Sequence, residues 1–323
     1  MFIISSYAIA VLFCIITMLC WGSWANTQKL AASTWRFELF YWDYVLGILI
    51  LSLLFAFTLG SMGEGGRSFI TDLSQADSRS ISSALFGGVL FNAANILLVA
   101  AISIAGMSVA FPVGIGLALV VGVVVNYLEA PVGNSTLLFA AVALVALAIL
   151  LNANAYRKLS TNTGVVSTKG LLLSVIAGLL MGFFYKYVAN SMFPDFTSPI
   201  AGKLSPYTAV VIFSLGILSS NFLFNTYLMM RPFVGIPVKF SAYFAGDFKT
   251  HLVGILGGLI WCVGMSFSIL ASDKAGPAIS YGLGQGATIV AAIWGIYIWK
   301  EFKGAPKGVN VILNLMLLCY ILG

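Results

Sequence analysis

The stretch of chain that decides the fold is GGVLFNAANILLVAAISIAGMSVAFPVGIG, residues 87–116. It holds no charged residue, and the apolar run on each side of its Ala-Gly pair extends to about twenty residues, enough for a helix to cross a bilayer. Both runs are continuous and do not alternate, so they predict helices and not the strands of a membrane barrel. We therefore expect two transmembrane helices joined by a tight turn.

Apolar runs of this kind follow one another along the whole chain. Its 323 residues are 60% hydrophobic and 8% charged, with a mean hydropathy of +1.03, whereas soluble domains carry about 25% charged residues. A water-soluble protein is therefore excluded, and we expect an all-α integral membrane protein. Ten transmembrane helices are predicted near residues 7–28, 40–60, 82–104, 107–128, 136–154, 169–190, 206–230, 250–272, 276–299 and 306–322.

A second copy of the deciding stretch lies 170 residues further on, at GGLIWCVGMSFSILASDKAGPAISYGLGQG, residues 257–286. Residues 87–128 pair with residues 257–298 without gaps. Both copies hold a Gly pair, a helix, an Ala-Gly turn, a GxG helix and a closing Tyr. The identical pairs are Gly87/Gly257, Gly88/Gly258, Ala101/Ala271, Ala105/Ala275, Gly106/Gly276, Gly114/Gly284, Gly116/Gly286, Val120/Val290 and Tyr127/Tyr297.

The repeat divides the chain into two halves of five helices. They are residues 1–154 and residues 169–323, joined by a cytoplasmic linker at 155–168. Because five is odd, the halves insert with opposite topology, and such inverted repeats place a substrate near the bilayer midplane between them. The sequence therefore predicts a secondary transporter that works by rocking one half against the other.

Loop charges predict the orientation, because Lys and Arg concentrate in cytoplasmic loops. With the N-terminus outside, the cytoplasmic loops hold eleven basic residues and the outer side holds five. We therefore expect a multi-pass protein of the cell inner (plasma) membrane with both termini outside. The eleven are Lys29, Arg36, Arg157, Lys158, Lys169, Arg231, Lys239, Lys249, Lys300, Lys303 and Lys307, and the five are Arg67, Arg79, Lys186, Lys203 and Lys274.

Charge and cysteine content point to no other class of protein. The net charge of +6 is scattered singly between apolar runs, so no basic tract for nucleic acid is present. The four cysteines lie in apolar runs without a CxxC spacing, and there is one His, so we expect neither a metal nor a cofactor. No Ser-His-Asp set or phosphate loop supplies catalytic residues, which argues against an enzyme. The oligomeric state is left open.

The chain resembles the ureide permeases in several stretches of both halves. The resemblance is collinear and spans nearly the whole chain, and it implies the drug/metabolite transporter superfamily, near the rhamnose and glucose/ribose porters. In the first half it rests on FYWDY (40–44), FTLGSMGE (57–64), GGVLFNAANILL (87–98), AGMSVA (105–110) and NYLE (126–129). In the second half it rests on AGKLSPYTAVVIFS (201–214), RPFVGIP (231–237), SAYF (241–244) and IWGIYIWKEF (293–302).

What this resemblance implies is proton-coupled uptake of neutral nitrogenous solutes such as allantoin, uracil and related ureides or nucleobases. The plant members carry a long central cytosolic segment with a nucleotide-binding-like motif, and this chain has only residues 155–168 in its place. Bacterial relatives without that segment are often linked to sugars. A sugar therefore stays open as the solute.

Five side-chain amides at mid-depth are candidates for binding the solute. Amides both donate and accept hydrogen bonds, which suits ureides, nucleobases and sugars alike. The alternative is that they form hydrogen bonds between helices. The five are Asn92, Asn95, Asn221, Asn225 and Gln285.

Aromatic side chains are candidates for the walls of the same site, because they can stack on a planar base or a sugar face. We expect Trp21, Trp24, Phe91, Trp261 and Tyr281 there. Trp24 and Tyr281 approach the predicted helix ends, so an interfacial aromatic belt is an alternative for these two.

Asp43 is the candidate for coupling transport to protons, because an acid next to apolar helix and aromatic residues is costly in lipid. The alternative is an interfacial acid at a helix N-terminus, where the dipole favours it. Glu129 is expected at a solvated helix end, Lys186 is expected to snorkel to the interface, and His251 is expected at the surface.

The leading hypothesis is an inward symporter of a small solute and protons. A rival within transport is an exporter of metabolites or drugs, which a large aromatic cavity with one acid would favour, whereas a tight amide-lined site favours uptake. A rival outside transport is a membrane receptor or scaffold, which has no need of an inverted repeat.

Overall fold

The computed structural model describes residues 1–31, 35–131, 133–163 and 167–323. In these ranges the chain is helical, with an isolated bridge between Met192 and Leu204 and no strand. Nine helices of the described ranges are long and apolar enough to cross a membrane. The last helix, Val309–Leu322, has 14 residues and is only about 21 Å long at 1.5 Å per residue. The all-α membrane fold is confirmed, and the count of ten spans stays a prediction.

Several spans consist of more than one helical segment, and two short helices lie in loops. The elements are α1 (Tyr7–Ser23), α2 (Ala25–Ala31), α3 (Phe37–Phe57), α4 (Phe69–Gln75), α5 (Ser78–Ala105), α6 (Met107–Ala110), the π-helix η1 (Phe111–Ile115), α7 (Gly116–Glu129), α8 (Ser135–Thr163), α9 (Thr168–Ser191), α10 (Pro206–Met230), α11 (Phe240–Phe244), α12 (Phe248–Ala275), α13 (Pro277–Gln285), α14 (Ala287–Ile293), the π-helix η2 (Trp294–Ile298) and α15 (Val309–Leu322).

One predicted boundary is wrong. The fifth helix was expected to end near residue 154, but α8 continues to Thr163 and takes up most of the segment expected as a linker, residues 155–168. Only the part of α8 from Ser135 to Ala155 is apolar enough to lie in the bilayer. The helix therefore continues beyond the hydrocarbon, because a polar sequence can stay helical after the apolar run ends. Residues 164–166 of the expected linker lie outside the described ranges.

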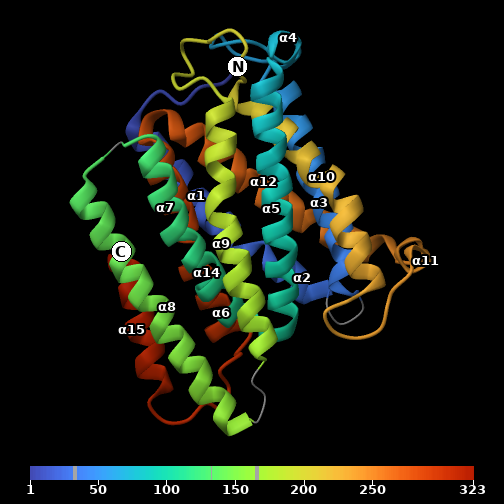
Figure 1. Ribbon diagram of the computed structural model, residues 1–323, viewed down its shortest axis with the longest axis vertical. Coiled ribbons are helices and arrows are strands. Elements are labelled where there is room, and N and C mark those ends of the chain that lie inside the picture. The colour runs from blue at the N-terminus through green and yellow to red at the C-terminus, as the bar shows by residue number, and fades with distance from the viewer. Residues whose placement is uncertain (32–34, 132, 164–166) are drawn as a thin grey trace.

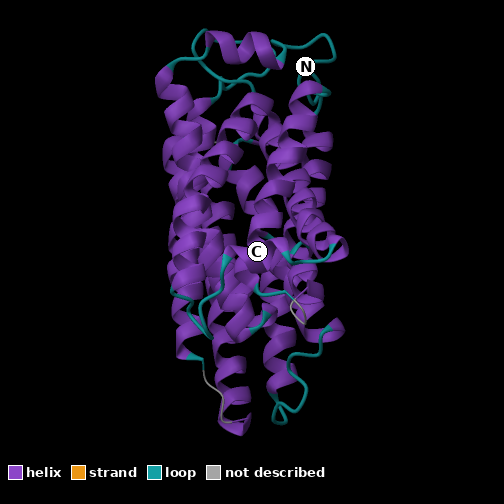
Figure 2. Ribbon diagram, turned by 90° about the vertical axis from the view of Figure 1, so that its right-hand side faces the viewer, coloured by secondary structure: helices purple, strands orange, loops and turns teal. Residues whose placement is uncertain are grey.

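The helices run along the long axis of the molecule (Figure 1). The N-terminus and α4 lie at the top, α8 and α15 form a pair at the left edge, and α11 lies at the right edge. In the view turned by 90°, most loops gather at the two ends (Figure 2). We call the end with the N-terminus and α4 the N-terminal face, and the end with the loops 231–247 and 299–308 the opposite face.

The two copies of the repeat form helices of equal length with equal caps. α5 and α12 have 28 residues each. Asp77 precedes the first and accepts a hydrogen bond from the Ser80 N–H at 2.6 Å, and Asp247 precedes the second and accepts one from the Thr250 N–H at 2.8 Å. A side-chain oxygen at this position satisfies an N–H that the helix leaves free. The offset of 170 residues therefore holds for the helix starts.

The same offset holds for the helix ends. Gly106 ends α5 with φ 86°, and Gly276 ends α12 with φ 80°. Only glycine adopts this backbone region without strain, so the Ala-Gly pair turns the chain from one span into the next at the same point of both copies. The expected tight turn is confirmed in both halves.

Glycine pairs bring the two halves into close contact. A Cβ on Gly88 of α5 would lie 2.1 Å from the carbonyl oxygen of Phe213 in α10, and one on Gly258 of α12 would lie 2.0 Å from that of Tyr44 in α3. Small residues let helix backbones approach in this way. Each 28-residue helix therefore packs tightly on the second span of the other half.

The following spans differ between the halves. Residues 107–129 contain the π-helix η1 near their start, at Pro112, whereas residues 277–298 are interrupted at Gly286 and end in η2. Proline lacks the N–H for a regular helical bond, and π-helical turns are frequent at functional sites. The irregular turns expose backbone and side chains toward the middle of the bundle.

Candidate functional site

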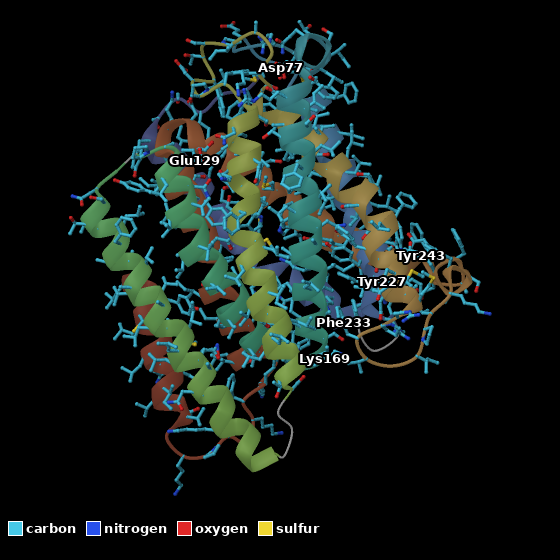
Figure 3. The ribbon with its side chains drawn as sticks, viewed as in Figure 1. Asp77, Glu129, Lys169, Tyr227, Phe233 and Tyr243 are labelled. Atoms are coloured by element: carbon cyan, nitrogen blue, oxygen red, sulfur yellow. The ribbon has the colours of Figure 1, made fainter. Side chains whose placement is uncertain are left out.

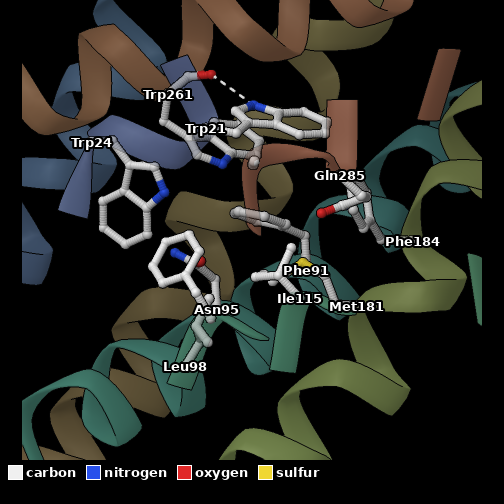
Figure 4. A pocket seen from close by; sticks show the side chains of 12 residues that line it. Trp21, Trp24, Phe91, Asn95, Leu98, Ile115, Met181, Phe184, Trp261 and Gln285 are labelled. Atoms are coloured by element: carbon white, nitrogen blue, oxygen red, sulfur yellow. Dashed lines mark hydrogen bonds between the residues drawn. The ribbon is translucent and has the colours of Figure 1, made fainter. Parts of the chain in front are cut away.

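A closed cavity lies inside the bundle, where spans of both halves meet (Figure 4). Its volume is about 20 Å³, which has room for roughly one water molecule. The structure is therefore closed around a site smaller than any ureide, base or sugar. The lining residues are Trp21, Trp24, Phe91, Asn95, Leu98, Phe111, Ile115, Met181, Phe184, Trp261, Gln285 and Ala287.

Aromatic rings form most of the wall. Trp21 and Trp261 stack with their centroids 5.9 Å apart and an interplanar angle of 14°, and Phe91 packs against Trp261 at 4.4 Å. The indole N–H of Trp21 donates to the Trp261 carbonyl at 3.2 Å, which fixes the two rings relative to each other. Phe184 contacts the far side of Phe91 at 5.2 Å. The wall presents flat apolar faces in a fixed arrangement.

Two side-chain amides face this aromatic wall. Asn95 donates through Nδ2 to the Tyr41 hydroxyl at 3.2 Å. The side-chain oxygen of Gln285 points toward the aromatic rings (Figure 4), and Gln285 makes no side-chain hydrogen bond of regular geometry within the described part of the chain. None of the lining residues is ionisable at neutral pH. The cavity can therefore stack on and hydrogen-bond a neutral solute, and it offers no charge to an ionic one.

Six predicted binding residues come together in the lining, and four do not. The six are Trp21, Trp24, Phe91, Asn95, Trp261 and Gln285, and the four are Asn92, Asn221, Asn225 and Tyr281. Whether any of the ten binds a solute stays a prediction.

Asn92 lies one turn from Asn95 but connects helices. Its Oδ1 accepts from the Tyr41 hydroxyl at 2.9 Å, and its Nδ2 donates to the Ser220 hydroxyl at 2.9 Å. These bonds join α3, α5 and α10. The alternative given above, a hydrogen bond between helices, describes the position of Asn92.

Asn221 and Asn225 also lie outside the cavity lining. Asn225 donates to the carbonyl oxygen of Glu38 at 2.8 Å, whereas neither side-chain atom of the fully buried Asn221 has a hydrogen-bond partner. A buried amide without a partner is costly. We have no physical account of Asn221 in this conformation.

The interfacial belt proposed as the alternative for Trp24 and Tyr281 is wrong. Trp24 is 2% exposed and Tyr281 is fully buried. The Tyr281 hydroxyl lies within hydrogen-bonding distance of the carbonyls of Met181 and Ala118, at 3.1 and 3.2 Å. Both side chains lie inside the bundle because their spans continue past them toward the face.

Asp43 lies in a cluster of aromatic residues near the opposite face, outside the cavity. Its Oδ1 accepts from the Tyr243 hydroxyl at 2.7 Å and lies 2.8 Å from His251 Nδ1, and its Oδ2 accepts from the indole N–H of Trp35 at 3.3 Å. Asp43 is 1% exposed. Burial raises the pKa of Tyr243, with a further rise from the hydrogen bond to Asp43 and its charge. We call Asp43, Tyr243, His251 and Trp35 the Asp43 cluster.

The surface position expected for His251 is wrong. The side chain is 21% exposed and its ring packs edge-on against Trp35 and Tyr243. Residues 43 and 251 are far apart in sequence, so the sequence contained no local signal for their contact. Tyr243 lies on α11, at the right edge of the molecule (Figure 3).

Two further acids near the helix ends have partners that the sequence did not reveal. Glu129, near the top of α7 in Figure 3, lies 3.1 Å from Lys186 of α9. Glu301 accepts the N–H groups of Met107 and Ser108 at 3.1 and 2.7 Å and pairs with Lys29. Burial opposes ionisation of Glu301, but the bonds from Lys29 and Ser108 outweigh it and lower its pKa. Glu301 was expected in a loop, and its inward position depends on the fold.

Sequence analysis also missed Phe111, Ile115, Met181 and Phe184 in the cavity lining. The signal available for the first two was Pro112, which predicts an irregular turn directly after Gly106. Met181 and Phe184 stand in an apolar run without a distinguishing pattern.

An all-helical membrane bundle with an uncharged cavity between its halves has the build of a multi-pass transporter of a small solute. The profile of the ureide permease family matches residues 40–163 and 157–323, so the chain belongs to the ureide permease family. The predicted resemblance is confirmed. Members of this family are permeases, so the chain is a membrane transporter and not an enzyme.

Individual relatives agree with this assignment. The chain is 21% identical to ureide permease 1 and 22% identical to ureide permease 2 of Arabidopsis thaliana, over 99% of this chain and 96% of each relative. The first alignment runs over 378 positions, more than the 323 residues here, so that relative contains residues this chain lacks. A putative sugar uptake protein of Streptococcus agalactiae is 30% identical over 122 residues, 36% of this chain and 42% of the relative.

A solved crystal structure has the same fold. It superposes with a TM-score of 0.58 over 97% of this chain and 95% of its own, at 14% sequence identity. At this identity the likeness establishes the fold alone.

Proposed function

We propose that the protein takes up a small neutral ureide or nucleobase across the membrane together with protons. The observation that supports this most is the cavity, with stacked indole rings on one side, two amides on the other and no ionisable group. A planar cyclic amide matches both parts, because its face stacks on aromatic rings and its edge both donates and accepts hydrogen bonds.

The small size of the cavity favours uptake over export. A tight site with Asn95 and Gln285 selects one polar solute, whereas exporters of varied amphipathic compounds need a wide aromatic chamber. No acid lies in the lining, which also speaks against cationic drugs as cargo.

The proposed movement is a rocking of residues 1–154 against residues 169–323. Both halves contribute to the lining: Asn95 and Trp21 belong to the first, and Gln285 and Trp261 to the second. A change in the relative position of the halves would therefore widen the site toward one face at a time, as alternating access requires. From the loop charges, the opposite face is proposed to be cytoplasmic and both termini to lie outside the inner (plasma) membrane.

Asp43 is the proposed site of proton coupling. Its carboxylate holds together α3, α11, α12 and the segment of Trp35 at the opposite face. A proton on that carboxylate would weaken the hydrogen bonds that depend on its charge. The same helix contains Tyr41, which binds Asn95 in the cavity lining, so movement of α3 reaches the solute site.

Uptake into proteoliposomes tests this function. Labelled allantoin, uracil and several monosaccharides are offered with and without an inward proton gradient. We expect allantoin or uracil to accumulate only with the gradient. Accumulation of a monosaccharide alone would replace the proposed solute class, and equal accumulation without the gradient would contradict proton coupling.

A further inference from the structure

The segment that joins η2 to α15 combines three lysines with one acid that faces inward. Lys300, Lys303 and Lys307 are exposed, and none has an acidic partner in the described part of the chain. Glu301, the acid between them, is occupied by Lys29 and by the start of α6. The segment, seen as the red turn at the bottom of Figure 1, therefore presents uncompensated positive charge at the opposite face.

Two of these lysines line a pocket of about 460 Å³ between this segment and α15. The pocket is separate from the solute cavity and shares no residue with it. No acid lines it. The lining residues are Ile296, Tyr297, Lys300, Phe302, Lys303, Asn310, Leu313 and Asn314.

Asn310 and Asn314 are the second observation. They stand one turn apart on α15, both are exposed, and neither side chain has a hydrogen-bond partner among the described residues. Amides on the outer face of an otherwise apolar helix are unfavourable in hydrocarbon unless a polar group meets them. Both face the pocket that contains the lysines.

Lys300 has an unusual backbone. Its φ of 53° is the only positive value at a non-glycine residue in the described ranges. Lysine is strained in this region, and such strain persists at sites where the position of a side chain matters. The strained turn brings Lys300 into the same pocket lining as Lys303.

The remaining wall is apolar. Ile296 and Leu313 line the pocket, and Tyr297 and Ile298 beside it are exposed by 53% and 58% on the outer surface of the bundle. Positive charge and amides next to an apolar surface match a molecule with a phosphate at one end and a hydrocarbon chain at the other. Inorganic phosphate would use only the polar half.

We propose that this pocket binds the head group of an anionic phospholipid. The lysine ammonium groups and the amide N–H groups would donate to the phosphate oxygens, and the acyl chain would lie along Ile296 and Leu313. This inference does not depend on the identity of the transported solute, because the two sites share no residue.

Native mass spectrometry of the full-length protein tests the proposal, with phosphatidylglycerol and phosphatidylcholine of equal chain length as probes. We expect retention of phosphatidylglycerol by the wild type and a roughly tenfold or greater loss in Lys300→Gln/Lys303→Gln. Lys239→Gln/Lys249→Gln is the matched control, because it removes the same charge from exposed lysines of the opposite face that lie outside the pocket. The control should retain the lipid.

A second variant leaves the charge unchanged. Asn310→Ala/Asn314→Ala should also lose phosphatidylglycerol, and thermal unfolding of each variant shows whether it is folded. Equal loss from the control pair would reduce the effect to general surface charge and overturn the pocket. Equal retention of phosphatidylcholine, or displacement of the lipid by inorganic phosphate or glycerol phosphate alone, would overturn the phospholipid as the ligand.

Discussion

Two short helices, α4 and α11, close the two ends of the bundle with different chemistry. Each precedes the aspartate cap of a 28-residue helix, Asp77 or Asp247, so the two occupy the same place in the two halves. α4 binds the start of α10, and α11 binds α3 near its start, so each contacts the second span of the other half.

At the N-terminal face the acid lies on the short helix. Asp72 of α4 is fully buried, accepts from Arg67 at 2.9 Å and from the Ser205 N–H at 2.7 Å. Arg67 also donates to the carbonyls of Ile200 and Lys203. A guanidinium keeps its charge throughout the physiological range, so this closure does not respond to protons.

At the opposite face the acid lies on the membrane span instead. Asp43 of α3 faces Tyr243 of α11 and His251 of α12. An imidazole changes its charge near neutral pH, unlike a guanidinium. The comparison teaches that equivalent contacts of the repeat contain a permanent ion pair at one end and a titratable pair at the other.

The largest expected effect breaks the titratable end. Asp43→Asn should abolish accumulation driven by a pH gradient while solute binding and exchange persist, because the amide mimics the protonated acid. Uptake and counterflow exchange in proteoliposomes measure the two activities, and Asp247→Asn, an exposed acid of the same face, is the control. Accumulation at the wild-type level in Asp43→Asn would leave Asp43 as a helix-terminal acid.

The next effect breaks the permanent end. Asp72→Ala leaves Arg67 without its carboxylate, and removing one partner of a buried pair costs about 3 kcal/mol. Thermal and denaturant unfolding in detergent should show this loss, with proton coupling unchanged in the protein that stays folded. Asp195→Ala, at an exposed acid of the same face, should change stability much less. Equal losses in the two variants would mean that the Arg67 contact contributes little.

The solute site sharpens the comparison, because each half supplies one amide. Asn95→Ala and Gln285→Ala should each weaken solute binding by about 1–3 kcal/mol, since each leaves a polar group of the solute unpaired. Asn92→Ala is the control for an amide that joins helices and lies outside the lining. Solute affinities within about twofold of wild type for both lining variants, below the size of one lost hydrogen bond, would exclude this cavity.

Glu301 tests the opposite face through a contact without a counterpart. Glu301→Gln should cost about 1.5 kcal/mol, because its carboxylate accepts several charge-assisted bonds. Its lowered pKa means that this stabilisation is present above the usual range of glutamate and is lost as the pH falls. The stability difference between wild type and variant should therefore narrow on acidification in unfolding measurements. A difference independent of pH would contradict the assignment.

The smallest effect is expected at Glu129 on the N-terminal face. Its pair with Lys186 is partly exposed, with side-chain exposures of 45% and 23%, so Glu129→Gln should cost less than about 1 kcal/mol. At the equivalent position 170 residues on, Trp299 donates to Asn26 at 2.7 Å and carries no charge. Added salt should lower the stability of wild type toward that of Glu129→Gln, and a larger, salt-independent loss would show that this pair is a main contact.

Much of the fold followed from local rules of sequence. The apolar runs predicted nearly every span to within a few residues, although the polar end of α8 was taken for a linker. Asp43 was identified because few acids lie inside apolar runs, but His251 was assigned to the surface because a single histidine near a predicted loop shows no partner in sequence.

What the sequence determined by itself is therefore the membrane class, the repeat and the ends of its longest helices. Gly106 and Gly276 fix their turns through their own backbone freedom, and Asp77 and Asp247 bind an N–H three residues away. These are contacts between near neighbours, which a pattern of residues can reveal.

Only the tertiary structure decided which side chains meet across the bundle. Gln285 faces Trp21 and Asn95, Glu301 reaches the start of α6, and His251 reaches Asp43 because spans of the two halves pack together at close glycine contacts. Such pairs are separated by up to about two hundred residues, and their distance depends on how whole helices cross. No local property of either residue encodes that crossing.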